Sequence, residues 1–185
     1  MTDPRWAVLG TLEAVPALDR PDLVADPVAH ALKLLDPADA ALVGVAEIDP
    51  DLADTAAFCA AYSSPPESSA NCVVVAGRRG EETRYAACLV LANTRADVNG
   101  IVRKRLNARK ASFAPMDDAV ALTGMEYGGI TPVGLPAEWP VLVDPAVAAA
   151  PAVVIGSGIR GSKLALPGVL AAALPGAEVL EGLAR

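Results

Sequence analysis

The spacing of apolar residues alternates between two periods along this chain of 185 residues, and each period predicts one kind of element. Between residues 22 and 35 apolar side chains recur every three to four positions, which is the period of an α-helix with one buried face. Further helices are predicted over 51–62, 98–106, 116–123 and 166–174. Asp97 precedes the third of these and is expected to cap it.

Short apolar runs rich in valine and other β-branched residues predict the strands. They cover residues 41–48, 72–76, 85–92, 141–143, 153–155 and 163–166. The segment GRRGEE separates two of them and has the composition of a hairpin turn. Helices and strands therefore interleave, with hairpins as well as crossovers. This order favours a mixed α+β (or α/β) domain with a central, mostly antiparallel or mixed sheet flanked by helices.

The length of 185 residues predicts a single domain, and the composition indicates how its core is built. Hydrophobic residues make up 53% of the chain and aromatic residues only 4%, so the core is expected to consist of small side chains. No apolar run has the length of a membrane span, and the N-terminus lacks the pattern of a signal peptide, so the expected location is the cytoplasm, without a membrane partner. The three cysteines show no CxxC spacing, which fits reduced thiols.

Several kinds of catalytic site are excluded. The single histidine, His30, rules out a multi-histidine zinc site, and no phosphate loop, GxSxG elbow or HExxH motif is present, so we expect neither a metal nor a cofactor. The segment GSGIRG at 156–161 superficially resembles a dinucleotide loop, but the residues after it predict a strand where that site needs a helix. We interpret it as a hairpin turn carrying Arg160, and an oxidoreductase that binds nicotinamide or flavin is the least favoured alternative.

The segment TGMEYGGITPVGLP at 123–136 is the strongest candidate for a site. Its glycines allow positive φ and close approach to the backbone, and its prolines stiffen the chain. A rigid loop with bare N–H groups suits a carbonyl, an oxyanion or a phosphate. A turn between two strands explains the same composition equally well.

Charged residues give two weaker candidates. Net charge is −7, yet residues 103–110 hold five cations and no acid: Arg103, Lys104, Arg105, Arg109 and Lys110. This basic stripe can dock a phosphate backbone, although from charge alone a solvated helix face is the simpler interpretation. Among the carboxylates, Asp144 ends the strand WPVLVD, where it either serves a pocket or caps the turn at Pro145.

The order of these motifs resembles the YbaK/EbsC family, the aminoacyl-tRNA deacylases related to the editing domain inserted in bacterial prolyl-tRNA synthetases. The resemblance covers roughly residues 40–183 and depends on CVVVA, AACLVLA, the basic helix, GGITP, the strand ending in Asp144 and VVIGSGIRGSKLALPG. It implies a YbaK-like domain over 41–185, with 1–40 as an N-terminal extension packed on it. It also implies a cytosolic hydrolase that acts in trans on mischarged tRNA, typically tRNA(Pro) carrying alanine or cysteine.

The resemblance also implies which residues form the site. The family's loop matches Gly128, Gly129, Ile130, Thr131 and Pro132, whose backbone would contact the aminoacyl group and its ester. Asn71 and Gly129 are the expected catalytic residues, Thr55 and Asp144 complete the substrate pocket, and the basic stripe would contact the tRNA. The expected partners are aminoacylated tRNA and an aminoacyl-tRNA synthetase.

One position departs from the family. A lysine usually precedes the first central strand, and Asn71 stands there in this chain. Asparagine donates hydrogen bonds but has no charge, so it cannot anchor a phosphate as lysine does. Either Asn71 orients the ester, or Lys104, Lys110 or Lys163 supplies the cation, or the protein is a binding module without catalysis.

Overall fold

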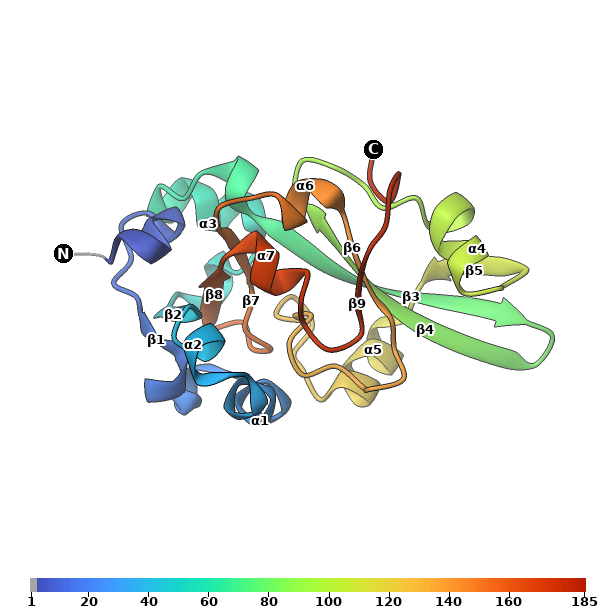
Figure 1. Ribbon diagram of the computed structural model, residues 1–185, viewed down its shortest axis with the longest axis horizontal. Coiled ribbons are helices and arrows are strands. Elements are labelled where there is room, and N and C mark those ends of the chain that lie inside the picture. Colours follow the sequence, from blue (N-terminus) through green and yellow to red (C-terminus); the bar gives the residue numbers. More distant parts are fainter. Residues whose placement is uncertain (1–2) are drawn as a thin grey trace.

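The structure is a computed structural model that describes residues 3–185. Its strands form two sheets; Figure 1 shows the smaller one on the left and the larger one running from the centre to the right, with the start of β3 reaching the smaller sheet. The four-stranded sheet has the order β1 (Val15–Pro16), β2 (Gly44–Glu47), β8 (Ser162–Leu166), β7 (Val153–Gly156), with antiparallel pairing throughout. The predicted mixed α+β class and the mostly antiparallel pairing are confirmed, but the strands are distributed over two sheets and not over one.

The second sheet has the order β5 (Lys110–Phe113), β3 (Ala70–Arg79), β4 (Glu82–Leu91), β6 (Val141–Val143), β9 (Ala177–Val179). The first three strands pair antiparallel, whereas β4, β6 and β9 run parallel. The two sheets approach each other at the start of β3, where Ser69 and Val154 form an isolated bridge. The main apolar core lies where the sheets meet, because both contribute fully buried side chains to it, such as Leu89 and Leu164.

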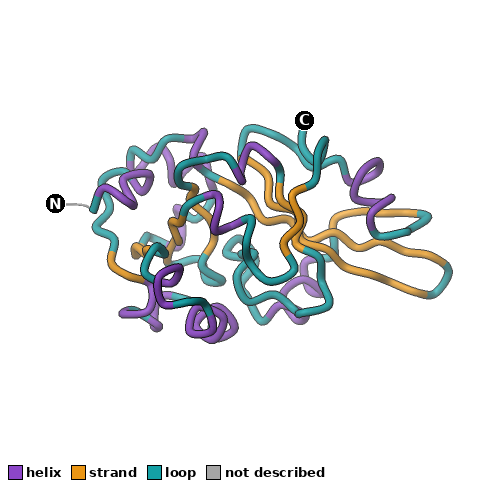
Figure 2. The backbone as a smooth tube through the Cα atoms, viewed as in Figure 1, coloured by secondary structure: helices purple, strands orange, loops and turns teal. Residues whose placement is uncertain are grey.

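The predicted hairpin is present and longer than its apolar residues indicate. Arg79 pairs with Glu82, so the turn consists of Gly80 and Glu81 alone, with Gly80 at φ +63°. Polar residues continue both strands because cross-strand pairing needs no apolar side chain at an exposed end. Figure 2 shows the resulting hairpin extending away from the rest of the chain.

The helix predicted at 116–123 is confirmed as Met116–Thr123, whereas the other predicted helices are shorter, two of them because Pro27 and Pro167 lie inside the predicted segments. Residues 22–35 begin with the 3-10 turn Pro21–Leu23, and the α-helix starts only at Asp26, with Pro27 in its first turn. Residues 98–102 form a π-type turn before α4. The α-helices are α1 (Asp26–Leu34), α2 (Pro37–Ala40), α3 (Thr55–Tyr62), α4 (Arg103–Arg105), α5 (Met116–Thr123), α6 (Pro145–Ala148) and α7 (Gly168–Ala171).

The described part of the first forty residues packs closely on the remainder; residues 1 and 2 lie outside the described residues. Trp6 is 2% exposed, donates from Nε1 to the Leu42 carbonyl at 3.0 Å, and covers Gly44, where a Cβ would lie 2.4 Å from the indole. Val28 and Leu32 of α1 belong to the main core. This segment therefore completes the four-stranded sheet and its core. None of the described helices is long and apolar enough to cross a membrane.

Asp144 connects the start of α6 with the C-terminal segment of the chain. The side chain is 8% exposed; Oδ1 accepts a hydrogen bond from Ala146 N–H at 2.9 Å at the start of α6, and Oδ2 accepts one from Ala184 N–H at 3.1 Å. We expect Asp144→Ala to destabilise the protein by about 2–3 kcal/mol, because both bonds to a buried charge are lost. This corresponds to a fall of roughly 4–10 °C in Tm, measured by calorimetry.

Asp36→Ala provides the matched control. The exposed Asp36 carboxylate caps α2 through one bond, to Ala38 N–H at 2.9 Å, and its loss is expected to cost about 0.5–1 kcal/mol. If the two substitutions lower Tm equally, the structural role assigned to the two hydrogen bonds of Asp144 is wrong.

Candidate functional site

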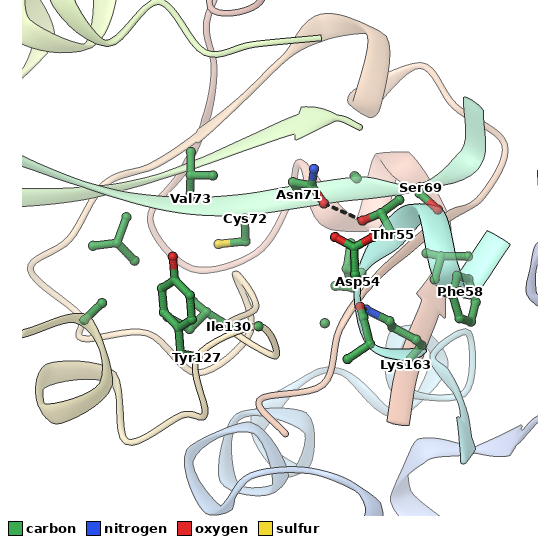
Figure 3. A pocket seen from close by; sticks show the side chains of 18 of the residues that line it. Asp54, Thr55, Phe58, Ser69, Asn71, Cys72, Val73, Tyr127, Ile130 and Lys163 are labelled. Carbon is green, nitrogen blue, oxygen red and sulfur yellow. Dashed lines mark hydrogen bonds between the residues drawn. The ribbon is translucent and has the colours of Figure 1, made fainter. Parts of the chain in front are cut away.

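A pocket of about 460 Å³ lies where the two sheets meet. Its walls come from the start of β3, the first turn of α3, the ends of β7 and β8, and the loop at 127–130 (Figure 3). Of the residues expected from the sequence, Thr55, Asn71, Gly128 and Ile130 line it. The pocket thus brings together segments that are far apart in the chain.

Close backbone packing holds the glycine loop in place. Gly158 N–H donates to the Gly129 carbonyl at 2.7 Å, and Glu126 N–H donates to the Gly158 carbonyl at 2.8 Å. A Cβ at Gly129 would lie 2.5 Å from the Ile159 carbonyl oxygen, and one at Gly156 would lie 2.3 Å from the Gly129 carbonyl oxygen. Only glycine fits at these two positions, so the loop is fixed against the β7–β8 turn.

The same packing determines which backbone N–H groups of the loop remain available to a ligand. Gly129 N–H donates to the Glu126 carbonyl at 2.9 Å and is therefore engaged within the loop. The N–H groups of Gly128 and Ile130 have no hydrogen-bond partner among the described residues, and both residues line the pocket. The loop can therefore donate from Gly128 and Ile130, while Gly129 contributes its shape.

Four expected site residues are not among those that line the pocket: Gly129, Thr131, Pro132 and Asp144. Thr131 and Pro132 are buried behind the loop; Thr131 is 0% exposed, and its hydroxyl has no hydrogen-bond partner among the described residues. Asp144 uses both carboxylate oxygens for backbone N–H groups, as described above. The structure therefore gives Asp144 the capping role that the sequence left as an alternative.

Asn71 lies at the rim of the pocket. Thr55 Oγ1 donates to Asn71 Oδ1 at 3.1 Å, which joins the first turn of α3 to the start of β3. Figure 3 shows the amide oxygen of Asn71 turned to Thr55 and its nitrogen turned away from Lys163. The position that carries lysine in the resembled family is thus exposed here and engaged in a neutral hydrogen bond.

Lys163 supplies a cation to the pocket wall. The strand SKLAL is buried throughout; Leu164 and Leu166 face the main core, and Lys163 and Ala165 face the opposite side, toward Phe58. Lys163 Nζ donates to the Ala53 carbonyl at 2.8 Å and lies 5.5 Å from the centre of the Phe58 ring. The sequence signal for it is a lysine inside an apolar strand.

Burial lowers the pKa of Lys163 below its usual value, because the charged form loses hydration. The Asp54 carboxylate opposes this shift, and the Arg160 guanidinium adds to it. None of the ion pairs among the described residues includes Lys163. The ammonium group therefore lies in the pocket wall without a carboxylate in direct contact.

Other reactive groups do not provide a nucleophile or a metal site. Cys72 lines the pocket, but burial raises the pKa of its thiol, so the thiolate is disfavoured. His30 is exposed on α1 and does not line the pocket. Within residues 3–185 no cluster of histidine, cysteine and acidic residues could hold a metal ion.

The segment GSGIRG forms the turn between β7 and β8, as predicted, and a strand follows it where a dinucleotide site requires a helix. Arg160 N–H donates to Glu126 Oε2 at 2.6 Å, and Arg160 Nη2 donates to the Pro50 carbonyl at 2.9 Å. A Cβ at Gly128 would lie 2.5 Å from Arg160 Nη1. Arg160 therefore supports the glycine loop, and the turn offers no nucleotide site.

The basic stripe lies away from the pocket, near the tip of the β3–β4 hairpin. Lys110 pairs with Arg78, which is seven residues along β3 from Asn71, or roughly 23 Å in an extended strand. Arg103 Nε donates to the Asn99 carbonyl at 2.8 Å, and Arg105 forms an ion pair with Glu178 at 2.8 Å. Lys104, Arg109 and Lys110 are exposed. Lys104 and Lys110 are not in the pocket, so Lys163 alone of the three lysines considered lines it.

Comparison with solved structures shows the same fold. A proposed trans-editing enzyme for prolyl-tRNA synthetase matches with a TM-score of 0.69 and 20% identity, over 85% of this chain and 96% of that chain. A hypothetical protein matches with a TM-score of 0.73 and 18% identity, over 86% of this chain and all (100%) of that chain. A scaffold protein used for epitope grafting matches with a TM-score of 0.69 and 22% identity, over 84% and 94% of the two chains.

None of the curated proteins compared with the chain matches it. The family model described as the aminoacyl-tRNA editing domain matches residues 49–172, which is more than half of the sequence. These residues include the pocket, the glycine loop and Lys163. The chain therefore belongs to the aminoacyl-tRNA editing domain family.

Proposed function

We propose that the protein is a trans-acting editing deacylase that hydrolyses the ester of mischarged tRNA, of the tRNA(Pro) type. The observation that carries the proposal is the convergence of Thr55, Asn71, Gly128 and Ile130 on one pocket of about 460 Å³. A pocket of this size suits an aminoacyl group and its ribose and is too small for an RNA helix. Membership of the editing family supports the same function.

The chemistry requires orientation more than a strong protein nucleophile, because an aminoacyl ester is already activated. The free N–H groups of Gly128 and Ile130 are suited to hold the oxyanion that forms when water attacks the carbonyl carbon. A donor in such a position lowers the activation barrier by about 2.7–4 kcal/mol. Hydrolysis by oriented water is compatible with a pocket that contains no histidine.

The lining of the pocket favours a small aminoacyl side chain. One end carries Cys72, Tyr127 and Ile130, and the other end carries Asp54, Thr55 and Lys163 (Figure 3). The first end is apolar and the second is polar and charged. We infer that a small side chain, as in alanine, cysteine or serine, occupies the apolar end, with the ester between the glycine loop and the charged residues of the polar end.

Two aromatic rings at the pocket fit an RNA terminus. The chain has only two Trp, three Tyr and two Phe, and its most exposed rings, Phe113 (62%) and Tyr127 (58%), both line the pocket. Exposed aromatic rings stack on unpaired bases. Their position supports a single-stranded tRNA end as the ligand.

Deacylation of tRNA(Pro) charged with alanine, cysteine or serine tests the proposal. We expect the wild type to release at least one amino acid well above the spontaneous rate. Cys72→Phe should abolish release because the added ring fills the pocket. Val169→Phe adds the same ring at an exposed position (69%) outside the pocket and should leave the rate unchanged. If all three charged tRNAs are deacylated only at the spontaneous rate, the proposed deacylase activity is wrong.

A second candidate function is a binding module of the same fold that lacks catalysis. The observation that favours it is Asn71 in the place of lysine, with a neutral hydrogen bond to Thr55. Because Asn71 is exposed, a longer side chain fits there. If the wild type binds charged tRNA without turnover, we expect Asn71→Lys to introduce hydrolysis at unchanged affinity; loss of an existing activity would instead favour the deacylase.

We further propose that the basic stripe contacts the acceptor stem of the tRNA, with an aminoacyl-tRNA synthetase as a further partner. Its free cations are Lys104, Arg109 and Lys110, because Arg103 and Arg105 are engaged within the protein. The separation of roughly 23 Å from Asn71 leaves room for the single-stranded end to enter the pocket while the stem reaches the stripe.

Replacing Lys104, Arg109 and Lys110 together by alanine should weaken tRNA binding and lower the salt slope of log K by about 2–3, one unit for each lost phosphate contact. Binding measured at several salt concentrations checks this. Hydrolysis of a short 3′-alanyl-adenosine ester should not change. Arg20→Ala with Lys33→Ala, on the N-terminal segment, is the control; an equal effect there would mean that binding depends on net charge alone.

A further inference from the structure

The polar end of the pocket contains two opposite charges that nothing described so far uses. Lys163 is 8% exposed, and Asp54, the N-cap residue of α3, is exposed and lines the same pocket. Figure 3 shows the Asp54 carboxylate and the Lys163 side chain at the same end of the pocket, with Thr55 and Asn71 beside them. A ligand at this end meets both charges.

The ammonium group of Lys163 has N–H donors that form no hydrogen bond among the described residues. An ammonium group carries three N–H donors, and the one hydrogen bond of Lys163 among the described residues goes to the Ala53 carbonyl at 2.8 Å. A buried charge without an ion pair is costly unless a ligand completes its hydrogen bonds. The two remaining donors therefore define a site for an oxygen atom with partial or full negative charge.

One carboxylate oxygen of Asp54 accepts no hydrogen bond among the described residues. Its Oδ1 caps α3 by accepting from Ala56 N–H at 3.0 Å and from Ala57 N–H at 3.4 Å. No hydrogen bond to Oδ2 is found among the described residues. This oxygen can accept a hydrogen bond from a cation in the pocket without disturbing the cap.

An α-aminoacyl ester carries the complementary pair of groups, an α-ammonium group next to a carbonyl oxygen. We propose that Lys163 donates hydrogen bonds to the ester carbonyl oxygen and Asp54 accepts one from the α-ammonium group, so that this charge pair selects α-amino esters. The inference rests on the proposed function and adds the two residues that recognise the reacting group.

The reaction balances without any further reagent. Water adds to the carbonyl carbon, and the negative charge that develops on the carbonyl oxygen is held by Lys163 and the loop amides. The bond between the acyl carbon and the ribose oxygen then breaks, a proton from the water ends on that ribose oxygen, and the free amino acid leaves. Lys163 keeps its proton and forms no covalent bond, so its contribution increases as charge develops on the oxygen.

Kinetics on alanyl-tRNA and on N-acetyl-alanyl-tRNA, in which the α-ammonium group is removed, test both contacts. Lys163→Met should lower kcat by about 10²–10³-fold and raise KM about tenfold on both substrates, because its hydrogen bond to the carbonyl oxygen is present in the ground state and strengthens as charge develops. Asp54→Asn keeps the cap, because asparagine is also a good N-cap. It should raise KM about tenfold for alanyl-tRNA and leave the acetylated substrate unaffected.

Matched controls separate recognition from folding. Lys33→Met removes an exposed lysine of α1, and Asp36→Asn alters the exposed cap of α2; neither should change the kinetics. Lys163→Gln retains a donor without charge, and the melting temperature of each variant checks folding. A rate of Lys163→Met within threefold of wild type, an equal effect of Asp54→Asn on both substrates, or an acyl group on Lys163 in the intact mass would each overturn the proposal.

If the wild type shows no deacylation, the proposed function fails while the charge pair is still tested. Binding of 3′-alanylamido-adenosine, an amide that is not hydrolysed, then provides the measurement. Lys163→Met and Asp54→Asn should each weaken its Kd about tenfold relative to the Lys33→Met and Asp36→Asn controls. Unchanged affinity in both variants would refute the inference.

Discussion

The contact between two backbone segments, the loop at 126–130 and the turn at 156–160, is the constraint on which the site depends. The segments exchange main-chain hydrogen bonds, and at Gly129 and Gly156 they approach too closely for any Cβ. The turn at 156–160 belongs to the four-stranded sheet, whereas the loop leads from α5 toward β6 of the other sheet. This contact therefore fixes one wall of the pocket relative to the other and leaves the Gly128 and Ile130 N–H groups without a partner among the described residues.

The position of Lys163 follows from the same architecture. Its strand, β8, is interior to the four-stranded sheet, and alternation along the strand places residue 163 on the side of α3 and not in the main core. A lysine there loses hydration and gains only one carbonyl and the face of Phe58. A hydrophobic residue of similar length would fill the volume with less cost to the folded state. The charge is thus explained by ligand binding more readily than by stability.

Sequence reasoning identified the local elements well and the contacts between sheets poorly. The β3–β4 hairpin, the helix at 116–123 and the turn at 156–161 were predictable because each depends on residues adjacent in the chain. The two-sheet arrangement depends on pairing between segments more than 100 residues apart, as between β2 and β8, and no local pattern encodes such pairing.

The same distinction applies to the site. Thr55, Asn71, Gly128 and Ile130 were reached through the order of motifs, and the structure brings them to one pocket. Asp144 ends a strand, as the sequence indicated, but whether its carboxylate faces a pocket or a helix start depends on α6 and the C-terminal segment. From the sequence, Lys163 was only one of three candidate lysines. The face of the sheet on which its side chain lies depends on the pairing of β8 with β2 and β7, which the sequence does not reveal.

The long strand β3 connects the pocket with the basic stripe. Its first residues line the pocket, and its last residues, Arg78 and Arg79, extend beside the basic stripe, where Arg79 Nε donates to the Asn107 carbonyl at 2.6 Å. A strand paired on both sides keeps these two ends at a constant distance, which is what the proposed function requires of a stem bound at one end and a terminal ester at the other. In a protein with a net charge of −7, the cluster of cations at this end is the part of the chain suited to the RNA contact proposed above.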